Sequence, residues 1–206
     1  MDEETPHIEV RAVDVNDALA LHALDANFET DRIYGLRVRN RLIEENEDAD
    51  GDNDLAFAFE LIEIPVDRPI YKDFHEYQHI EELVTAQLQA GGGGYVALAD
   101  GQLAGGVVLT VDKNRAVAQI QELIVGRQYR RYGIGSLLLT CAADWARERH
   151  CWAIVLETQN SNYPAIQFYL RNGLEIWSIG QNYYPPGVSE HEIAIFMGKR
   201  LSSNPS

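Results

Sequence analysis

The sequence has few cysteines, no long apolar run and no recognisable export signal. Its two cysteines, Cys141 and Cys151, are too few for a disulfide framework or a cysteine-based zinc site, and we interpret them as small buried thiols in a reducing cytoplasm. No apolar run approaches the roughly 18 to 20 residues that a membrane-spanning helix needs. The acidic N-terminus MDEETPHIEV has neither the basic nor the apolar region of a secretory signal. We therefore predict a cytoplasmic protein without membrane contact.

Basic residues are also scarce relative to acidic ones. The chain has 17 Lys and Arg against 32 Asp and Glu, a formal net charge of −15. Nucleic-acid binding depends on cationic patches, so we predict no nucleic-acid partner. An acidic surface would attract cationic partners, although net charge by itself mainly maintains solubility. With 206 residues, 46% of them hydrophobic, the chain fits one domain with its own core.

Alternating and continuous apolar segments predict most of the strands. We expect them at residues 7–13, 55–66, 95–112, 114–125, 151–158, 174–184 and 192–201. Pro65 is expected to help terminate the second of these, and Asp100-Gly101 to form the turn of a hairpin within the third. FETDRIYGLRVRNRLIEEN, residues 28–46, is ambiguous. The acidic segment from Glu44 to Asp54 is typical of an exposed loop or hairpin tip.

Helical spacing predicts four helices. A short one is expected after a cap at Asp14 or Asn16, and a second over residues 73–90, stopped by the run GGGG. The third covers residues 137–149 and the fourth NYPAIQFYLRNG, residues 162–173. The apolar face of the third helix is expected to consist of Leu137, Leu138, Cys141, Ala142 and Trp145. Strands and helices in this order indicate a mixed α/β sheet.

The loop RQYRRYGIG has the features of an anion-binding site. Gly133 and Gly135 lie where the third helix begins, so backbone N–H groups can approach a ligand at the positive end of the helix dipole. Arg130 and Arg131 could add charge-assisted hydrogen bonds to phosphate oxygens. The alternative is an ordinary tight turn between strand and helix. The nucleotide motifs GxxxxGK[ST] and GxGxxG are both absent from this loop.

Two segments resemble the GNAT N-acetyltransferase family. IQELIVGRQYRRYGIGSLLL, residues 120–139, is similar to the family's acetyl-CoA motif, Gln/Arg-x-x-Gly-x-Gly/Ala after a central strand. NSNYPAIQFYLRNGLEI, residues 160–176, is similar to its second motif at the expected distance. The overlapping segment VLETQNSNYPAIQFY, residues 155–169, is similar to the streptothricin acetyltransferase branch. The resemblance extends over roughly Tyr95 to Leu174.

The resemblance implies a GNAT fold. This is a mixed central sheet of about six to seven strands, flanked by helices, in which two splayed strands form the acetyl-CoA slot. We expect a single domain over residues 1–206. About residues 1–93 would form the acceptor side, and about residues 94–200 the acetyl-CoA-binding core. A homodimer is a possible assembly.

The same resemblance assigns acetyl-CoA, as cosubstrate, to particular residues. Backbone amides of the loop would hold the pyrophosphate, and the strand before it would pair with the pantetheine arm and offer an N–H group, at Val125 or a neighbour, to the thioester oxygen. Asn162 would lie beside the thiol end, or cap the next helix. The expected contacts are Leu123, Ile124, Val125, Arg130, Arg131, Tyr132, Gly133, Ile134, Gly135, Ser136 and Asn162.

Two residues are the catalytic candidates. An alkylammonium, with a pKa of about 10.4, must lose a proton before it can attack, and Glu122 on the central strand is the expected base. Many relatives read Glu-Asp here where this chain reads Gln121-Glu122, and the assignment requires the strand to direct Glu122 into the slot. By its match to the second motif, Tyr169 is the expected general acid for the departing thiolate. Its alternative is an aromatic core residue.

The acidic balance and the streptothricin-like segment together favour a cationic, amine-bearing small molecule as acceptor, such as a streptothricin-like antibiotic. Two alternatives remain open. The acceptor could be a protein or peptide amine, or the chain could be a non-catalytic module that binds acyl-CoA.

One motif points to different chemistry. HEYQH, from His75 to His79, matches the HExxH signature of zinc peptidases in a stretch with helical spacing. A third ligand is missing, because no Glu occurs between Glu82 and Glu122 and no suitably spaced His follows. We predict no metal site and interpret the segment as a polar helix face.

Overall fold

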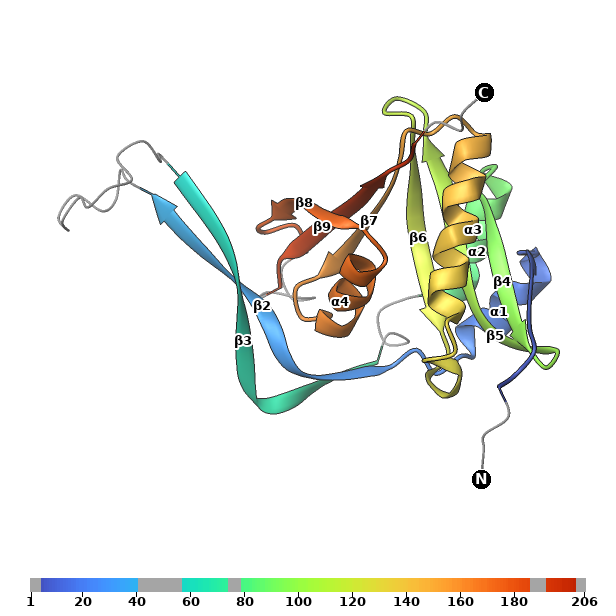
Figure 1. Cartoon of the computed structure of the whole chain (residues 1–206), viewed down its shortest axis with the longest axis horizontal. Helices are drawn as coiled ribbons and strands as arrows, with labels where there is room; N and C mark the ends of the chain where they lie inside the picture. The colour runs from blue at the N-terminus through green and yellow to red at the C-terminus, as the bar shows by residue number, and fades with distance from the viewer. Residues whose placement is uncertain (1–4, 41–56, 74–78, 186–191, 203–206) are drawn as a thin grey trace.

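A computed structural model describes residues 5–40, 57–73, 79–185 and 192–202. Seven strands form one sheet in the order β1-β4-β5-β6-β7-β9-β8, and β2 and β3 form a separate ribbon (Figure 1). The strands are β1 (Ile8–Ala12), β2 (Phe28–Asn40), β3 (Phe57–Lys72), β4 (Gly93–Ala99), β5 (Gln102–Asp112), β6 (Val117–Val125), β7 (Ala153–Gln159), β8 (Glu175–Gly180) and β9 (Ala194–Arg200). The α-helices are α1 (Ala18–His22), α2 (Ile80–Gln89), α3 (Ile134–Glu148) and α4 (Tyr163–Arg171).

Helices cover both faces of the large sheet. The apolar side of α3 packs on β4, β5, β6 and β7 and joins the larger core cluster. Helices α1 and α2 pack together on the opposite face, where Leu21, Ile80 and Val84 meet Val96, Val108 and Ile124 in a smaller cluster. Strands β6 and β7 are parallel and the other neighbours antiparallel. The predicted α/β class and mixed seven-stranded sheet are therefore confirmed.

A β-bulge in β6 reverses which residues face which core. Leu109 pairs with Ile120, but Val108 pairs with Glu122, so Gln121 is the extra residue. Before the bulge Ile120 belongs to the core beneath α3, and after it Ile124 belongs to the core beneath α1 and α2. Glu122 shares the face of Ile124 because alternate residues of a strand point the same way. Without the bulge, Glu122 would point toward α3.

Several sequence-based boundaries are corrected by the structure. The second predicted strand does not end at Pro65, because β3 continues to Lys72. Pro65 lies opposite Arg32, where the β2–β3 register shifts, and a proline is tolerated at such an irregularity in a two-stranded ribbon. The ambiguous segment after residue 28 is strand β2. The acidic segment 44–54 lies outside the described residues.

Two helices also differ from their predicted limits. Helix α3 begins at Ile134, so its first turn includes the loop glycine Gly135. Its buried face consists of Ile134, Leu138, Leu139, Ala142, Ala143, Trp145 and Ala146, whereas Leu137 is exposed. The predicted face was wrong at Leu137 because apolar residues occupy several adjacent positions there, and spacing does not select among them. Helix α2 begins at Ile80, later than predicted.

The β2–β3 ribbon, which we call the arm, extends away from the rest of the molecule in Figure 1. Asn160 fastens its base: the Asn160 amide donates to the Tyr34 carbonyl (2.7 Å), and the Tyr34 N–H donates to the Asn160 carbonyl (3.1 Å). Gln167 of α4 adds a hydrogen bond to the Tyr34 hydroxyl. Toward the free end, Val38, Phe57 and Phe59 are 40 to 58% exposed.

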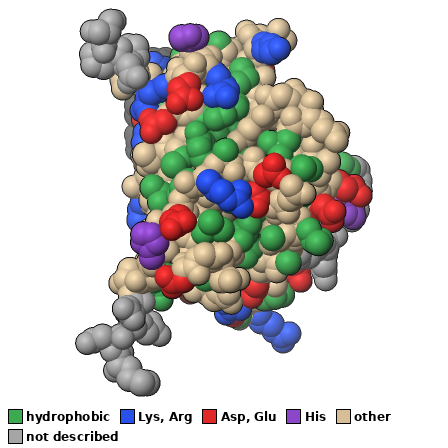
Figure 2. Space-filling view, turned by 90° about the vertical axis from the view of Figure 1, so that its right-hand side faces the viewer, with side chains coloured by type: hydrophobic (Ala, Val, Ile, Leu, Met, Phe, Trp, Pro, Cys, Tyr) green, Lys and Arg blue, Asp and Glu red, His purple; other side chains and the backbone are tan. Residues whose placement is uncertain are grey.

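On the face turned to the viewer in Figure 2, charged side chains of both signs are interspersed with apolar ones. Among the described residues, no helix is long and apolar enough to cross a membrane.

Candidate active site

The parallel strands β6 and β7 separate after a short paired stretch. They pair only from Val117 with Ala153 to Gln119 with Val155, although β6 continues to Val125 and β7 to Gln159. A cavity of about 680 Å³ adjoins the separated segments, and residues of the β6–α3 loop, β7 and α4 also line it. The predicted splayed strands are thus present.

The cavity brings together most of the residues singled out from the sequence. Its lining includes Glu122, Leu123, Ile124, Val125, Arg130, Arg131, Gly133, Ile134, Gly135, Ser136, Asn162 and Tyr169. Tyr132 is not part of the lining and is partly exposed. Their assigned roles stay predictions, because proximity alone does not establish a contact with a ligand.

The start of α3 offers free hydrogen-bond donors to this cavity. Gly133 precedes the helix with φ of 81°, a left-handed conformation that favours glycine. No side chain caps the helix, and the first intrahelical hydrogen bond of the turn comes from Leu137 to the Gly133 carbonyl. The N–H groups of Ile134, Gly135 and Ser136 are therefore available at the positive end of the helix dipole. This donor set fits a pyrophosphate group.

Gly135 has a packing role beside its backbone role. A Cβ atom at this position would lie 2.9 Å from the Phe168 ring, closer than carbon atoms ordinarily approach. Phe168 comes from α4, so the absence of a side chain lets α4 pack against the first turn of α3. The packing alternative for this glycine and the anion-binding interpretation are compatible.

Arg130 has partners within the protein. Its Nη1 donates to the Asn27 carbonyl (2.8 Å) and its Nε to the Val125 carbonyl (3.2 Å). These bonds join the end of β6 to the residue just before β2. A phosphate contact of Arg130 would use its remaining N–H groups, whereas Arg131 makes no hydrogen bond of its side chain to the described residues.

Asn162 acts as the N-cap of α4. Its Oδ1 accepts a hydrogen bond from the Ala165 N–H (3.3 Å), and Pro164 occupies the first turn. The capping interpretation of Asn162 is therefore correct, and the residue also lines the cavity.

Glu122 lies deep in the cleft. Water can reach the residue from the cavity, so by surface area it is half-buried, but protein surrounds its carboxylate on almost every side. This desolvation, reinforced by the negative charge of Glu157, raises the pKa of Glu122 to about 8. No described residue donates a hydrogen bond to it. A carboxylate with a pKa near neutrality has the property that a general base requires.

Tyr169 is buried beside Glu122. Desolvation raises its pKa above the ordinary value of a phenol, and the charges of Glu122 and Glu157 act in the same direction. The hydroxyl is therefore neutral and can donate a proton or a hydrogen bond. The ring also packs edge-on against Phe168 and belongs to the larger core, so the core interpretation holds for the ring.

The sequence reasoning missed Glu157 and Tyr184. Glu157 lies on β7, lines the cavity and accepts a hydrogen bond from the Tyr184 hydroxyl. A charged residue within the apolar strand segment CWAIVLET was an available signal, since carboxylates are seldom buried without a partner. Tyr184 follows β8 and is brought close by the fold, so no local pattern indicated it.

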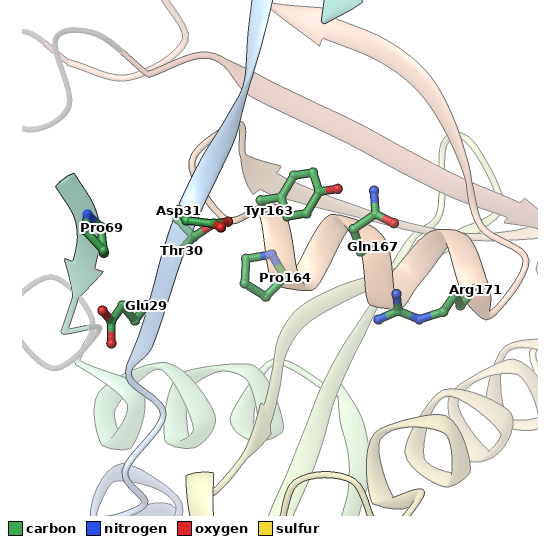
Figure 3. Close-up of a pocket in the computed structure, with 8 residues that line it drawn as sticks. All are labelled: Glu29, Thr30, Asp31, Pro69, Tyr163, Pro164, Gln167 and Arg171. Carbon is green, nitrogen blue, oxygen red and sulfur yellow. The ribbon is translucent and has the colours of Figure 1, made fainter. Parts of the chain in front are cut away.

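A second cavity of about 510 Å³ lies between the base of the arm and α4. Figure 3 shows Glu29, Thr30, Asp31 and Pro69 of the arm opposite Tyr163, Pro164, Gln167 and Arg171 of α4. Pro164 and Arg171 line both cavities. Arg171 is a cation near the larger cavity that the motifs did not indicate.

The structure describes only the last residue of the HEYQH motif. His79 precedes α2 with φ of −85° and ψ of 71°, so it lies outside the helix, although a helix was predicted over residues 73–90. Residues 74–78 lie outside the described residues. The described part of the chain contains no group of three or more His, Cys, Asp or Glu arranged to hold a metal ion.

Comparisons with known proteins agree with this site. The profile of the Acetyltransferase (GNAT) family matches residues 58–174, and the chain belongs to that family. It is an acetyl-CoA-dependent N-acetyltransferase. The streptothricin acetyltransferase of Streptomyces lavendulae is 31% identical over 92% of this chain and 93% of that protein.

Solved structures extend the similarity to the fold. The crystal structure of nourseothricin acetyltransferase superposes with a TM-score of 0.75 at 28% identity, over 95% of this chain and 99% of that one. A putative streptothricin acetyltransferase from Bacillus anthracis, solved with acetyl coenzyme A, gives 0.72 at 23% identity over 95% and 99%. At that identity the second comparison supports the fold alone.

Proposed function

We propose that the acceptor is a primary amine of a cationic small molecule, with streptothricin as the first compound to test. The observation that carries this proposal is the pair of carboxylates, Glu122 and Glu157, that lines the cleft where the two strands separate. An ammonium group is the complementary partner for such a pair. The similarity to streptothricin and nourseothricin acetyltransferases over nearly the whole chain adds support.

In the proposed reaction Glu122 acts first. It accepts a proton from the acceptor ammonium, which leaves a neutral amine whose lone pair attacks the thioester carbonyl carbon. Above a pH of about 8 the carboxylate is ionised and ready, while at lower pH a growing fraction is already protonated. The base therefore limits the rate on the acidic side.

The attack forms a C–N bond and places negative charge on the former carbonyl oxygen. A backbone N–H at Val125 or its neighbour stabilises that charge. The C–S bond then breaks, and the thiolate of coenzyme A takes a proton from the Tyr169 hydroxyl. The tetrahedral nitrogen gives up its remaining extra proton, which restores the phenol directly or through water. The products are an N-acetyl amine and free coenzyme A.

The donor side of the site would be held by backbone groups. The N–H groups at the start of α3, with Gly133 and Gly135, bind the pyrophosphate, and Leu123, Ile124 and Val125 pair with the pantetheine arm. Arg131 and Ser136 are exposed beside the same turn. Tyr132, whose side chain lies outside the cavity lining, would contribute through its backbone.

Acceptor-dependent thiol release tests the proposal. The full chain is incubated with acetyl-CoA and, separately, streptothricin, other polyamine antibiotics, and peptides with free N-termini or lysines. We expect saturable release with streptothricin and its product to carry one acetyl group. Preference for the peptides would establish a protein or peptide acetyltransferase. Binding of acetyl-CoA without release by any amine would establish a non-catalytic module.

A further inference from the structure

Glu157 is one of the two carboxylates in the cleft, but the proton transfers described above involve only Glu122 and Tyr169. It lies on β7, the strand that separates from β6, and its side chain lines the cavity. The Tyr184 hydroxyl donates a hydrogen bond to its Oε1. Glu122 of β6 lines the same cavity, feels the negative charge of Glu157 and receives no hydrogen bond from any described residue.

The charges around this pair are unbalanced. Tyr169 of α4 and Tyr184 are neutral neighbours, and Glu192 contributes a further negative charge. Lys72 of β3 pairs with Glu192 and also donates to the Gln159 side chain (3.1 Å). Arg130, Arg131 and Arg171 line the same cavity as the two carboxylates. No Lys or Arg of the described chain forms an ion pair with Glu122 or Glu157. Buried carboxylates without a cation are unfavourable, so the cleft is suited to receive one.

We propose that Glu157, held by the Tyr184 hydroxyl, is the subsite that binds the cationic amine of the acceptor beside Glu122. This inference rests on the proposed function and adds the residue that selects a charged acceptor. Glu157 remains the anionic partner of the ammonium, whereas Glu122 receives its proton. A neutral amine or a hydroxyl compound gains nothing from Glu157 and is a poor acceptor.

The surroundings of the two carboxylates explain this division. The pKa of Glu157 is raised overall, chiefly by burial and also by the charge of Glu192, while the hydrogen bond from Tyr184 acts in the opposite direction because it stabilises the ionised form. Glu122 has no such bond, and its pKa is raised to about 8. The hydrogen bond from Tyr184 thus favours the ionised form of Glu157, and Glu122 has no comparable bond. Each carboxylate also raises the proton affinity of the other, as like charges do.

The first arm of the test is kinetic. Glu157→Gln removes the charge and nearly preserves the shape, and Glu175→Gln on the exposed part of β8 is the matched control. We expect Glu157→Gln to raise the KM for a cationic acceptor at least tenfold while the KM for acetyl-CoA stays within twofold. The acidic limb of its kcat/KM profile should move to lower pH, because Glu122 loses a negative neighbour. Tyr184→Phe should raise the acceptor KM less.

The second arm needs no acetyl transfer. With ¹³C-labelled glutamate, the Glu122 carboxyl is titrated by NMR in wild type, Glu157→Gln and Glu175→Gln, and lysinamide serves as a cationic probe. We expect the Glu122 titration to move to lower pH only in Glu157→Gln, and lysinamide to shift the Glu122 resonance in wild type but not in that variant. Thermal unfolding checks that each variant is folded.

The two arms separate the possible failures. If wild type acetylates no amine but the titration and lysinamide results are as expected, the proposed function fails and the subsite stands. If Glu157→Gln behaves like Glu175→Gln in acceptor KM, in pH profile and in the titration, the subsite is overturned.

Discussion

Residues 94–200 and residues 28–72 hold their strands together in different ways. In the first region β4 to β9 all belong to one sheet, with α3 packed across its middle strands. In the second region β2 and β3 pair only with each other, over most of their length. Tyr34 of β2 bonds to Asn160 and Gln167, and Lys72 of β3 bonds to Gln159 and Glu192.

We propose that the two substrates use these regions differently. Apart from Asn162, the proposed donor groups come from one continuous stretch, β6 through the start of α3, so a short motif indicates them. The acceptor side of the cavity takes Phe28 from the arm, Ile80 from α2 and Glu157 from β7, which are far apart in the sequence. In this proposal acetyl-CoA is bound by groups that are local in the sequence, and the acceptor by groups that tertiary structure brings together. The following predictions test the acetyl-CoA side and the acceptor side of the cavity separately.

The largest effect is expected on the donor side. Gly135→Glu adds a side chain where a Cβ would lie 2.9 Å from the Phe168 ring and a negative charge at the helix N-terminus. We expect acetyl-CoA affinity, measured by calorimetry, to fall more than 100-fold. Ser136→Glu adds the charge without that clash and should also weaken binding at least tenfold.

The control is Leu137→Glu, which places the same charge one residue further on, at an exposed position outside the cavity lining. Its affinity should stay within about threefold of wild type. Equal losses in all three variants would mean that the start of α3 is not the phosphate site.

A smaller effect, on turnover, is expected for Tyr169, which lies between the proposed donor and acceptor sides of the cavity. Tyr169→Phe keeps the ring that packs on Phe168 and removes the hydroxyl beside Glu122. We expect kcat to fall about 100-fold while the Kd for acetyl-CoA is nearly unchanged, as measured by steady-state kinetics and calorimetry. Turnover equal to that of wild type would remove Tyr169 from the mechanism.

The smallest effect on catalysis, but a measurable effect on stability, is expected for the hydrogen bonds between Asn160 and the base of the arm. Asn160→Ala leaves the Tyr34 carbonyl and the Ile193 N–H without their side-chain partner. The free energy of unfolding should fall by about 2 kcal/mol or more, with acetyl-CoA affinity unchanged.

Asn172→Ala provides the comparison, because that amide also donates to one backbone carbonyl but lies at the end of α4, away from the arm. It should lower stability less and leave the acceptor KM unaffected. A larger loss in Asn172→Ala would contradict the assigned role of Asn160.

Local patterns in the sequence predicted the regular half of the molecule. The hairpin at Asp100-Gly101 is present, with φ of 49° and 79°, and so are the Pro164 start and Gly173 stop of α4. Turn and cap signals succeed because they depend on a few adjacent residues. Of the arm, the strand over residues 55–66 was predicted and is present as β3, although it continues beyond Pro65. Its partner β2 was left ambiguous, since residues 28–46 alternate too weakly.

The sequence indicated the cavity-lining residues of β6 and the β6–α3 loop, but not the side chains whose direction or partner depends on strand pairing and tertiary structure. The bulge at Gln121 sets the direction of Glu122. The bulge arises from the register of β6 against β5, and the sequence of β6 alone does not predict that register. The hydrogen bond between Tyr184 and Glu157 depends on the path of the chain after β8. That path is set by tertiary structure, so the local sequence does not predict the contact.

The most direct test of acetyl transfer in the cleft is the pH dependence of acceptor-stimulated thiol release, measured for wild type and Glu122→Gln. For wild type, kcat/KM should rise with pH, reach half of its plateau near pH 8 and level off above that, because the base must be ionised and its pKa is about 8. Glu122→Gln should bind acetyl-CoA normally, turn over about 100-fold or more slowly, and lack that rise. Wild-type turnover in the variant, with the same pH profile, would contradict the account.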